Sequence, residues 1–156
     1  MTAWAERPLV EATLLNPALV AVLLAAAARD YDTEAAGMPW PLAFLVPPLI
    51  LHRPTRDVLP RDTRTHLSTW IRRYPLLRAG FPNRAAAMVP ITREGIRFGL
   101  RAGVLALDGA GLTGHLAAEP PAGELRQLVR RAALVGRWLA KTDQPSTVFA
   151  LLGVAP

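Results

Sequence analysis

Fifteen prolines divide this 156-residue chain into short segments, and their positions limit its fold more than any other feature. Proline lacks a backbone N–H and clashes with the preceding helical turn, so it suits the first turn of a helix and interrupts a helix elsewhere. Asn16-Pro17 therefore predicts a helix that runs to about Tyr31, because the asparagine side chain can accept a hydrogen bond from a free amide of the first turn. We expect a mostly helical chain with about six or seven helices.

The later helices are predicted from prolines, capping residues and apolar residues at helical spacing. Pro41 is expected to open a helix that is kinked or restarted at Pro47-Pro48. Phe81-Pro82 is expected to open a short helix, and Thr92 to cap the helix that follows it. The other predicted helical segments are 63–74, capped by Asp62 or Thr63, then 121–141, and a terminal turn at 148–152.

A helix and a hairpin are predicted in the stretch that follows Thr92. The helix ends at Gly103, since glycine readily adopts the left-handed conformation found after the last helical turn. Residues 104–107 and 112–116 have the apolar character of two strands, and Asp108-Gly109 between them is typical of a tight turn.

A helix followed directly by a hairpin is typical of the end of a winged helix. We therefore predict a mostly α fold with one β-hairpin, in a winged-helix-like single domain. The domain spans 1–156, with a helical N-terminal part at 1–80 and a winged-helix-like part at 81–156.

Positive charge is concentrated in the middle of the chain. The formal net charge is +6, and residues 51–101 alone hold eleven arginines against three acidic residues. Such a segment suits a polyanion or an acidic protein surface, while a solvated arginine-rich face is the alternative. The arginines predicted to form this face are Arg64, Arg72, Arg73, Arg93, Arg97 and Arg101.

Three of these arginines lie four residues apart, so Arg93, Arg97 and Arg101 form one ridge on the helix before the hairpin. The ridge could contact phosphates, dock acidic side chains or simply face solvent. The ridge is poorly suited to recognising a DNA sequence, because its helix carries no Asn or Gln to recognise adenine, although arginine can recognise guanine.

Two apolar stretches, 12–28 and 37–51, are interrupted by prolines and are too short for a typical membrane span. No basic run precedes an apolar block at the start of the chain, so neither a signal peptide nor a membrane partner is expected, and the cytoplasm is the expected location. The segments 40–51 and 148–152 are either core or partner contacts. The candidate contact residues are Trp40, Leu42, Phe44, Leu45, Val148, Phe149 and Leu152.

No pattern in the sequence predicts catalysis. The chain has no cysteine, its three histidines are scattered, and it lacks the nucleophile, HExxH and EF-hand motifs. The glycine-rich segment 108–114 lacks the lysine of a phosphate-binding loop and precedes a predicted strand, so a hairpin turn explains it better. We therefore expect no enzyme activity, no cofactor and no metal site.

Five sequence blocks, taken in order, resemble the middle component of bacterial three-component ABC systems. They are LLNPAL at 14–19, the proline-rich segment 38–70, VPITREGIRFGL at 89–100, ALDGAGL at 106–112 and FALLGVAP at 149–156. In these systems the middle component is paired with an ABC-type ATPase and a further component. The resemblance implies a non-enzymatic adaptor that joins the ATPase to an effector or to DNA in bacterial defence.

Other functions are also compatible with the sequence. A stand-alone winged-helix transcription regulator would bind a defined DNA duplex as a homodimer, so DNA and a second copy of the chain are further candidate partners. A small membrane-associated protein is the second rival class, and it would sediment with membranes and resist extraction by salt. An enzyme is third, and nothing in the sequence nominates a substrate.

Overall fold

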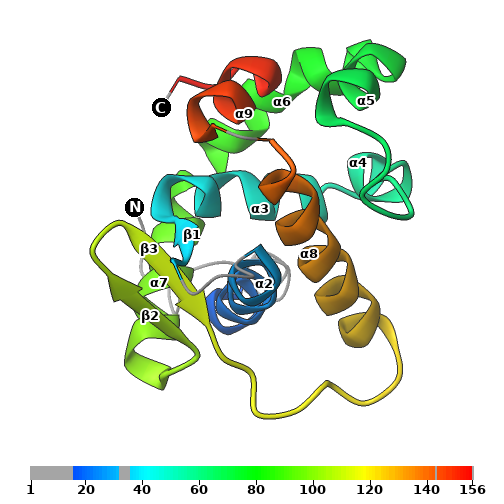
Figure 1. Ribbon diagram of the computed structural model, residues 1–156. Coiled ribbons are helices and arrows are strands. Elements are labelled where there is room, and N and C mark those ends of the chain that lie inside the picture. Colours follow the sequence, from blue (N-terminus) through cyan, green and yellow to red (C-terminus); the bar gives the residue numbers. More distant parts are fainter. Residues whose placement is uncertain (1–15, 32–35, 143, 156) are drawn as a thin grey trace.

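The computed structural model describes residues 16–31, 36–142 and 144–155 (Figure 1). Residues 12–15 of the first apolar stretch lie outside these ranges, as do the first two residues of the block at 14–19. The predicted mostly helical fold with a hairpin is confirmed, with eight α-helices, one 3-10 helix and three short strands in the described part. In chain order they are α2 (Pro17–Tyr31), β1 (Met38–Pro39), η2 (Trp40–Leu45), α3 (Val46–Ile50), α4 (Arg53–Asp57), α5 (Leu67–Arg73), α6 (Pro75–Ala87), α7 (Val89–Ala102), β2 (Leu105–Asp108), β3 (Gly111–Gly114), α8 (Glu124–Ala140) and α9 (Pro145–Leu152).

The central element is α2, which Figure 1 shows nearly end-on with α7 on one side and α8 on the other. Its residues 23–28 are Leu-Leu-Ala-Ala-Ala-Ala and are all fully buried. Small residues let the neighbouring helices approach closely, because a Cβ added at Gly136 of α8 would overlap the carbonyl oxygen of Ala27. A Cβ at Gly95 of α7 would likewise overlap the Val20 side chain. The three helices are therefore fixed side by side.

The three strands form one antiparallel sheet in the order β1-β3-β2. The hairpin is where the sequence predicts it, with Leu105 opposite Gly114 and Gly109 in the turn at a φ of +59°. The strand β1 was not predicted; its Met38 pairs with Leu112 of β3. The helix-then-hairpin order of α7, β2 and β3 is compatible with a winged helix, but the sheet also uses residues from the first half of the chain.

Several helix ends confirm the local signals. The Asn16 side chain accepts a hydrogen bond of 2.8 Å from the amide of Ala18 at the start of α2. Gly103 and Gly153 follow α7 and α9 with φ of +80° and +74°, as expected of glycines that end helices. The predicted restart near Pro47-Pro48 is also correct, because both prolines lie in the first turn of α3.

Four predicted helix starts are wrong, and one of them is that of α8, which begins at Glu124 rather than at residue 121. Thr92 does not cap α7, which begins at Val89; its buried hydroxyl donates to the Met88 carbonyl at 2.8 Å. Neither Asp62 nor Thr63 caps α5, which begins only at Leu67, because the Asp62 carboxylate instead accepts from a backbone amide two residues later.

The fourth incorrect start is at Phe81-Pro82, because Pro82 lies inside α6. A proline in a helix interior removes one backbone hydrogen bond. The Arg84 guanidinium donates to the Leu77 carbonyl at 2.8 Å, five residues before the proline, and adds a side-chain hydrogen bond to this part of the helix. The helix therefore continues through a residue that usually interrupts one.

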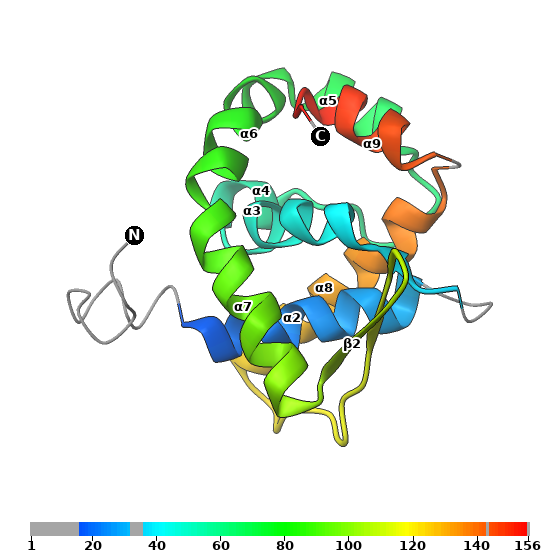
Figure 2. The ribbon, with the colours of Figure 1, turned by 90° about the vertical axis from the view of Figure 1, so that its left-hand side faces the viewer.

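At the opposite end of the molecule from the hairpin, α9 packs against α5 and α6 (Figure 2). The indole rings of Trp70 and Trp138 meet edge to face there, with centroids 5.3 Å apart, and join α5 to α8. Both indoles are at most 2% exposed, so they belong to the core. Among the helices of the described residues, none is long and apolar enough to cross a membrane.

Candidate functional site

The outer face of α7 carries the predicted arginine ridge. The inner face of this helix is buried through Ile91, Gly95 and Gly99, which face α2 and the sheet. Because residues four apart lie on one side of a helix, Arg93, Arg97 and Arg101 point away from that contact, and all three are exposed. The fold thus presents the three guanidinium groups to solvent.

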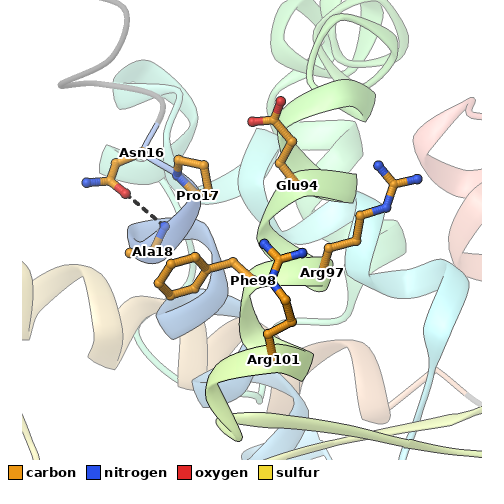
Figure 3. A pocket seen from close by; sticks show the side chains of 7 residues that line it. All are labelled: Asn16, Pro17, Ala18, Glu94, Arg97, Phe98 and Arg101. Atoms are coloured by element: carbon orange, nitrogen blue, oxygen red, sulfur yellow. Dashed lines mark hydrogen bonds between the residues drawn. The ribbon is translucent and has the colours of Figure 1, made fainter. Parts of the chain in front are cut away.

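A hollow of about 500 Å³ lies beside this ridge, between α7 and the start of α2 (Figure 3). In Figure 3 the Phe98 ring points from α7 toward the first residues of α2, and Arg101 extends along α7 toward it. The hydrogen bond from the Ala18 amide to Asn16 holds the opposite wall in place. The residues that line the hollow are Asn16, Pro17, Ala18, Glu94, Arg97, Phe98 and Arg101.

The chemistry of this hollow suits recognition better than catalysis. Phe98 is 39% exposed, and the Arg97 and Arg101 side chains line the same hollow. Aromatic and arginine side chains are the residue types that most often dominate the binding energy of protein interfaces. Within the described residues, no three histidine, aspartate or glutamate side chains gather closely enough to hold a metal ion.

The six arginines predicted to form one face do not lie together. Arg72 and Arg73 are exposed on α5, and Arg64 is exposed in the segment that leads into it. Figures 1 and 2 place α5 at the end of the molecule opposite the lower part of α7, which carries Arg97 and Arg101. The candidate basic face therefore reduces to the ridge on α7.

Five of the seven apolar residues considered as partner contacts are in the core. Leu42 and Leu45 of η2 are fully buried, and so are the α9 residues Val148 and Leu152, while Phe149 is 6% exposed. Short helices bury these side chains because they pack onto their neighbours, with α9 lying against α5 and α6.

Two of the seven apolar candidates remain at the surface. Trp40 is 46% exposed, and its ring meets the Phe44 ring edge to face with centroids 6.2 Å apart. Phe44 itself is half-buried. These two rings form a small aromatic patch on η2, and they are the two residues of the seven predicted apolar contacts that are not buried in the core.

Sequence reasoning missed a second group of arginines on α8. Arg126, Arg130, Arg131 and Arg137 recur at helical spacing, and that spacing is the signal by which they could have been found. The net charge of residues 102–156 is close to zero, because the acidic residues of this segment balance the α8 arginines. The net charge of a long segment therefore did not reveal these arginines, whereas their positions on one helix would have done so.

A comparison with protein-family models gives a match, which covers nearly the whole chain. A family model described as ABC-three component (ABC-3C) system Middle Component 3 matches residues 4–156. This match contains all five sequence blocks that suggested the same resemblance, so that prediction is confirmed. Searches of curated proteins and of solved structures found no match to the chain.

Proposed function

The chain belongs to the Middle Component 3 family of ABC-three component systems, and from that membership we propose that it is a non-enzymatic adaptor. In this proposal it links the ABC-type ATPase of its system to an effector or to DNA, in the cytoplasm and in the service of bacterial defence. The observation that carries the proposal is the family match over 4–156, since a middle component has partner components by definition.

The α7 face supports the adaptor role and is the docking surface that we propose for the ATPase. Phe98 offers an aromatic anchor, Arg97 and Arg101 line the same hollow, and that hollow can receive a side chain of the partner. An exposed aromatic ring at the centre of such a patch gains the most when a partner excludes water from it. The arginines favour an acidic rim on the partner surface.

The test is an affinity purification of the tagged protein from its native host, washed at about 0.5 M salt so that exposed charge contacts are screened. We expect an ABC-type ATPase, identified by mass spectrometry, to be retained in stoichiometric amount by the wild-type protein. Phe98→Ala should lose most of it. Leu76→Ala is the matched control, because Leu76 is 87% exposed on α6 and its truncation removes a large apolar side chain elsewhere.

Recovery of the chain alone would contradict the adaptor proposal. Equal retention of the ATPase by Phe98→Ala and Leu76→Ala would keep the adaptor role but remove the α7 face from it. Circular dichroism of both variants confirms that they are folded, so that a loss of binding reports on the surface.

One observation favours a second function, a stand-alone winged-helix transcription regulator. The ridge helix α7 directly precedes the hairpin, and its arginines face outward, as a DNA-contacting helix requires. The regulator would protect a defined duplex upstream of its own gene in footprinting, and replacing Arg93, Arg97 and Arg101 by Glu would abolish that protection. Protection by the purified chain without the ATPase would favour this function over the adaptor.

A further inference from the structure

A second basic surface lies on α8, on the side of α2 away from α7 (Figure 1). It is a hollow of about 410 Å³ between α8 and the segment that connects α4 to α5. We call it the α8 groove. It is lined by Arg61 from the connecting segment and by Gln127, Arg130, Arg131, Leu134 and Arg137 from α8.

The α8 residues of the groove follow one face of the helix. Positions 130, 131, 134 and 137 follow position 127 by three, four, seven and ten residues, so the five side chains form a continuous stripe. At 1.5 Å per residue the stripe extends over about 15 Å. The groove is therefore an elongated strip of guanidinium groups, with a length that can meet several charges of one extended ligand.

Two buried indoles fix the opposite wall of the α8 groove. Trp138 donates through Nε1 to the Thr65 carbonyl at 2.7 Å, and Trp70 donates through Nε1 to the Val58 carbonyl at 2.8 Å. These two carbonyls bracket Arg61 along the chain. The segment is thus tied to α8 and α5 at both ends, and the Arg61 backbone is held across from the stripe before any ligand arrives.

The arginines of the α8 groove are only partly neutralised. Arg130 pairs with Glu119 at 2.8 Å and Arg137 pairs with Asp30, but neither acid is part of the stripe. Arg61 and Arg131 form no ion pair with another residue of the described ranges. The lining itself contains no acidic residue, so the uncompensated positive charge of the groove is that of Arg61 and Arg131, on its two opposite walls.

The lining also lacks the groups that other classes of partner need. Its one apolar residue, Leu134, is only 8% exposed, and no aromatic ring lines it. A protein partner gains most of its affinity from apolar and aromatic anchors, and single-stranded nucleic acid is usually held by aromatic stacking. Guanidinium groups instead match phosphate geometry and bind it without regard to sequence. We propose that the α8 groove binds the phosphate backbone of duplex nucleic acid.

This inference rests on the proposed adaptor role and deepens it, because it assigns nucleic acid to a surface separate from the α7 face. The chain then holds protein on one side of α2 and a duplex on the other. Each assignment can be refuted without the other. The α7 face is tested by capture of the ATPase, and the α8 groove is tested by binding of a duplex to the purified full chain.

The test is fluorescence anisotropy with a labelled 20-base-pair DNA of mixed sequence at 0.1 M salt. R61E/R131E is the α8 variant, and R72E/R73E on α5, where both arginines are exposed, is the control with the same change of formal charge, four units. Losing two phosphate contacts should weaken binding by about 30- to 100-fold and make the salt dependence of log K shallower by about 2. The α5 control should weaken binding by less than about threefold, the effect of net charge alone.

Several results would overturn the proposal. They are an equal loss in both variants, an unchanged affinity in R61E/R131E, no binding by the wild-type chain at 0.05 M salt, tighter binding of a single strand, or equal competition by polyglutamate of matched total charge. The last result would assign the groove to an acidic protein. R61Q/R131Q provides a milder variant, and it must show the same order of loss if R61E/R131E fails to fold.

Discussion

The helices α7 and α8 pack against opposite sides of α2 in a similar way, yet they present different chemistry to solvent. Both approach α2 through glycine and both expose arginines. On α7 the arginines are interleaved with exposed apolar side chains, with Phe98 at 39% and Leu100 at 40%. On α8 they line a groove in which no acidic or aromatic residue takes part. Equal charge therefore does not mean equal function; the neighbours of each guanidinium group decide what it can recognise.

The two helices also differ in how the rest of the chain holds them. The α8 helix is tied by Trp138 to a segment more than seventy residues earlier, with a hydrogen bond of 2.7 Å. The buried polar side chain of α7, Thr92, hydrogen-bonds only within its own turn, to the Met88 carbonyl. The hydrogen bond from Trp138 thus helps to hold together the two elements of the α8 groove, whereas the arginine ridge lies on α7 alone.

The largest expected difference in the free energy of unfolding is between substitutions on the inner faces of α8 and α7, which pack against α2. Gly136→Ala places a Cβ against the backbone of Ala27, which cannot move without shifting α2, so we expect a loss of about 3 kcal/mol or more in the free energy of unfolding. Gly95→Ala meets the Cβ and one methyl group of the stiff Val20 side chain rather than a backbone carbonyl, and should cost about 2 kcal/mol. Urea unfolding of both variants measures this, and equal losses would show that the two contacts are equally rigid.

A smaller effect is expected from the tie between α8 and the connecting segment. Trp138→Phe removes the indole donor to the Thr65 carbonyl and leaves space in the core, at a cost of about 1 to 3 kcal/mol. The α7 counterpart, Thr92→Val, should cost about 1 kcal/mol or less, because the Met88 carbonyl keeps the backbone amide of residue 92 as a donor.

Thermal unfolding compares these two variants, and the duplex affinity of the folded Trp138→Phe protein adds a second readout. We expect that affinity to fall, since Arg61 is then held less firmly across the groove, while Thr92→Val leaves it unchanged. A Trp138→Phe protein with the wild-type duplex affinity would show that the tie matters for stability alone.

Replacing an exposed arginine on the outer face of α8 or α7 should lower the free energy of unfolding only slightly, and slightly more where the arginine forms an ion pair. Arg137→Gln removes the pair with Asp30 and should cost at most about 1 kcal/mol at low salt, and less at 1 M salt, where the pair is screened. Arg97→Gln on α7 should change the free energy of unfolding by less than about 0.5 kcal/mol. Chemical denaturation at two salt concentrations measures both, and a salt-independent loss in Arg137→Gln would point to packing of its alkyl chain.

The smallest predicted effect is a titration on the α8 side. The hydrogen bond from Arg130 lowers the pKa of the Glu119 carboxyl, and the charges of Arg130, Arg126 and Arg29 act in the same direction. Because the folded-state pKa is depressed, this contribution to stability is present above the unfolded-state pKa and is lost as the pH falls through the folded-state pKa. Arg130→Gln should raise the Glu119 pKa toward its ordinary value.

NMR titration of the Glu119 side chain follows that pKa directly. The Arg126→Gln variant is the control, because its guanidinium lies 4.0 Å from the carboxylate and donates no hydrogen bond to it, so its effect should be the smaller one. A larger shift in Arg126→Gln than in Arg130→Gln would contradict the assignment of the cause.

Much of the candidate site could be predicted because it lies on one helix. The spacing of Arg93, Arg97 and Arg101 is enough to place them on one face, and the structure shows all three exposed. The hollow beside them could not be predicted, because its other wall is formed by Asn16 and Pro17, about eighty residues earlier in the chain. The same reason explains why Arg61 was not assigned to α8.

The sequence by itself determined the local features of this protein and its family. Asn16-Pro17, Gly103 and Asp108-Gly109 specify a helix start, a helix end and a turn through contacts that span only a few residues. Tertiary structure alone decided the pairing of Met38 with Leu112, the continuation of α6 through Pro82 and the burial of Leu42 beside an exposed Trp40. These outcomes depend on which distant segments pack together, and that packing follows from the whole core rather than from any short run of residues.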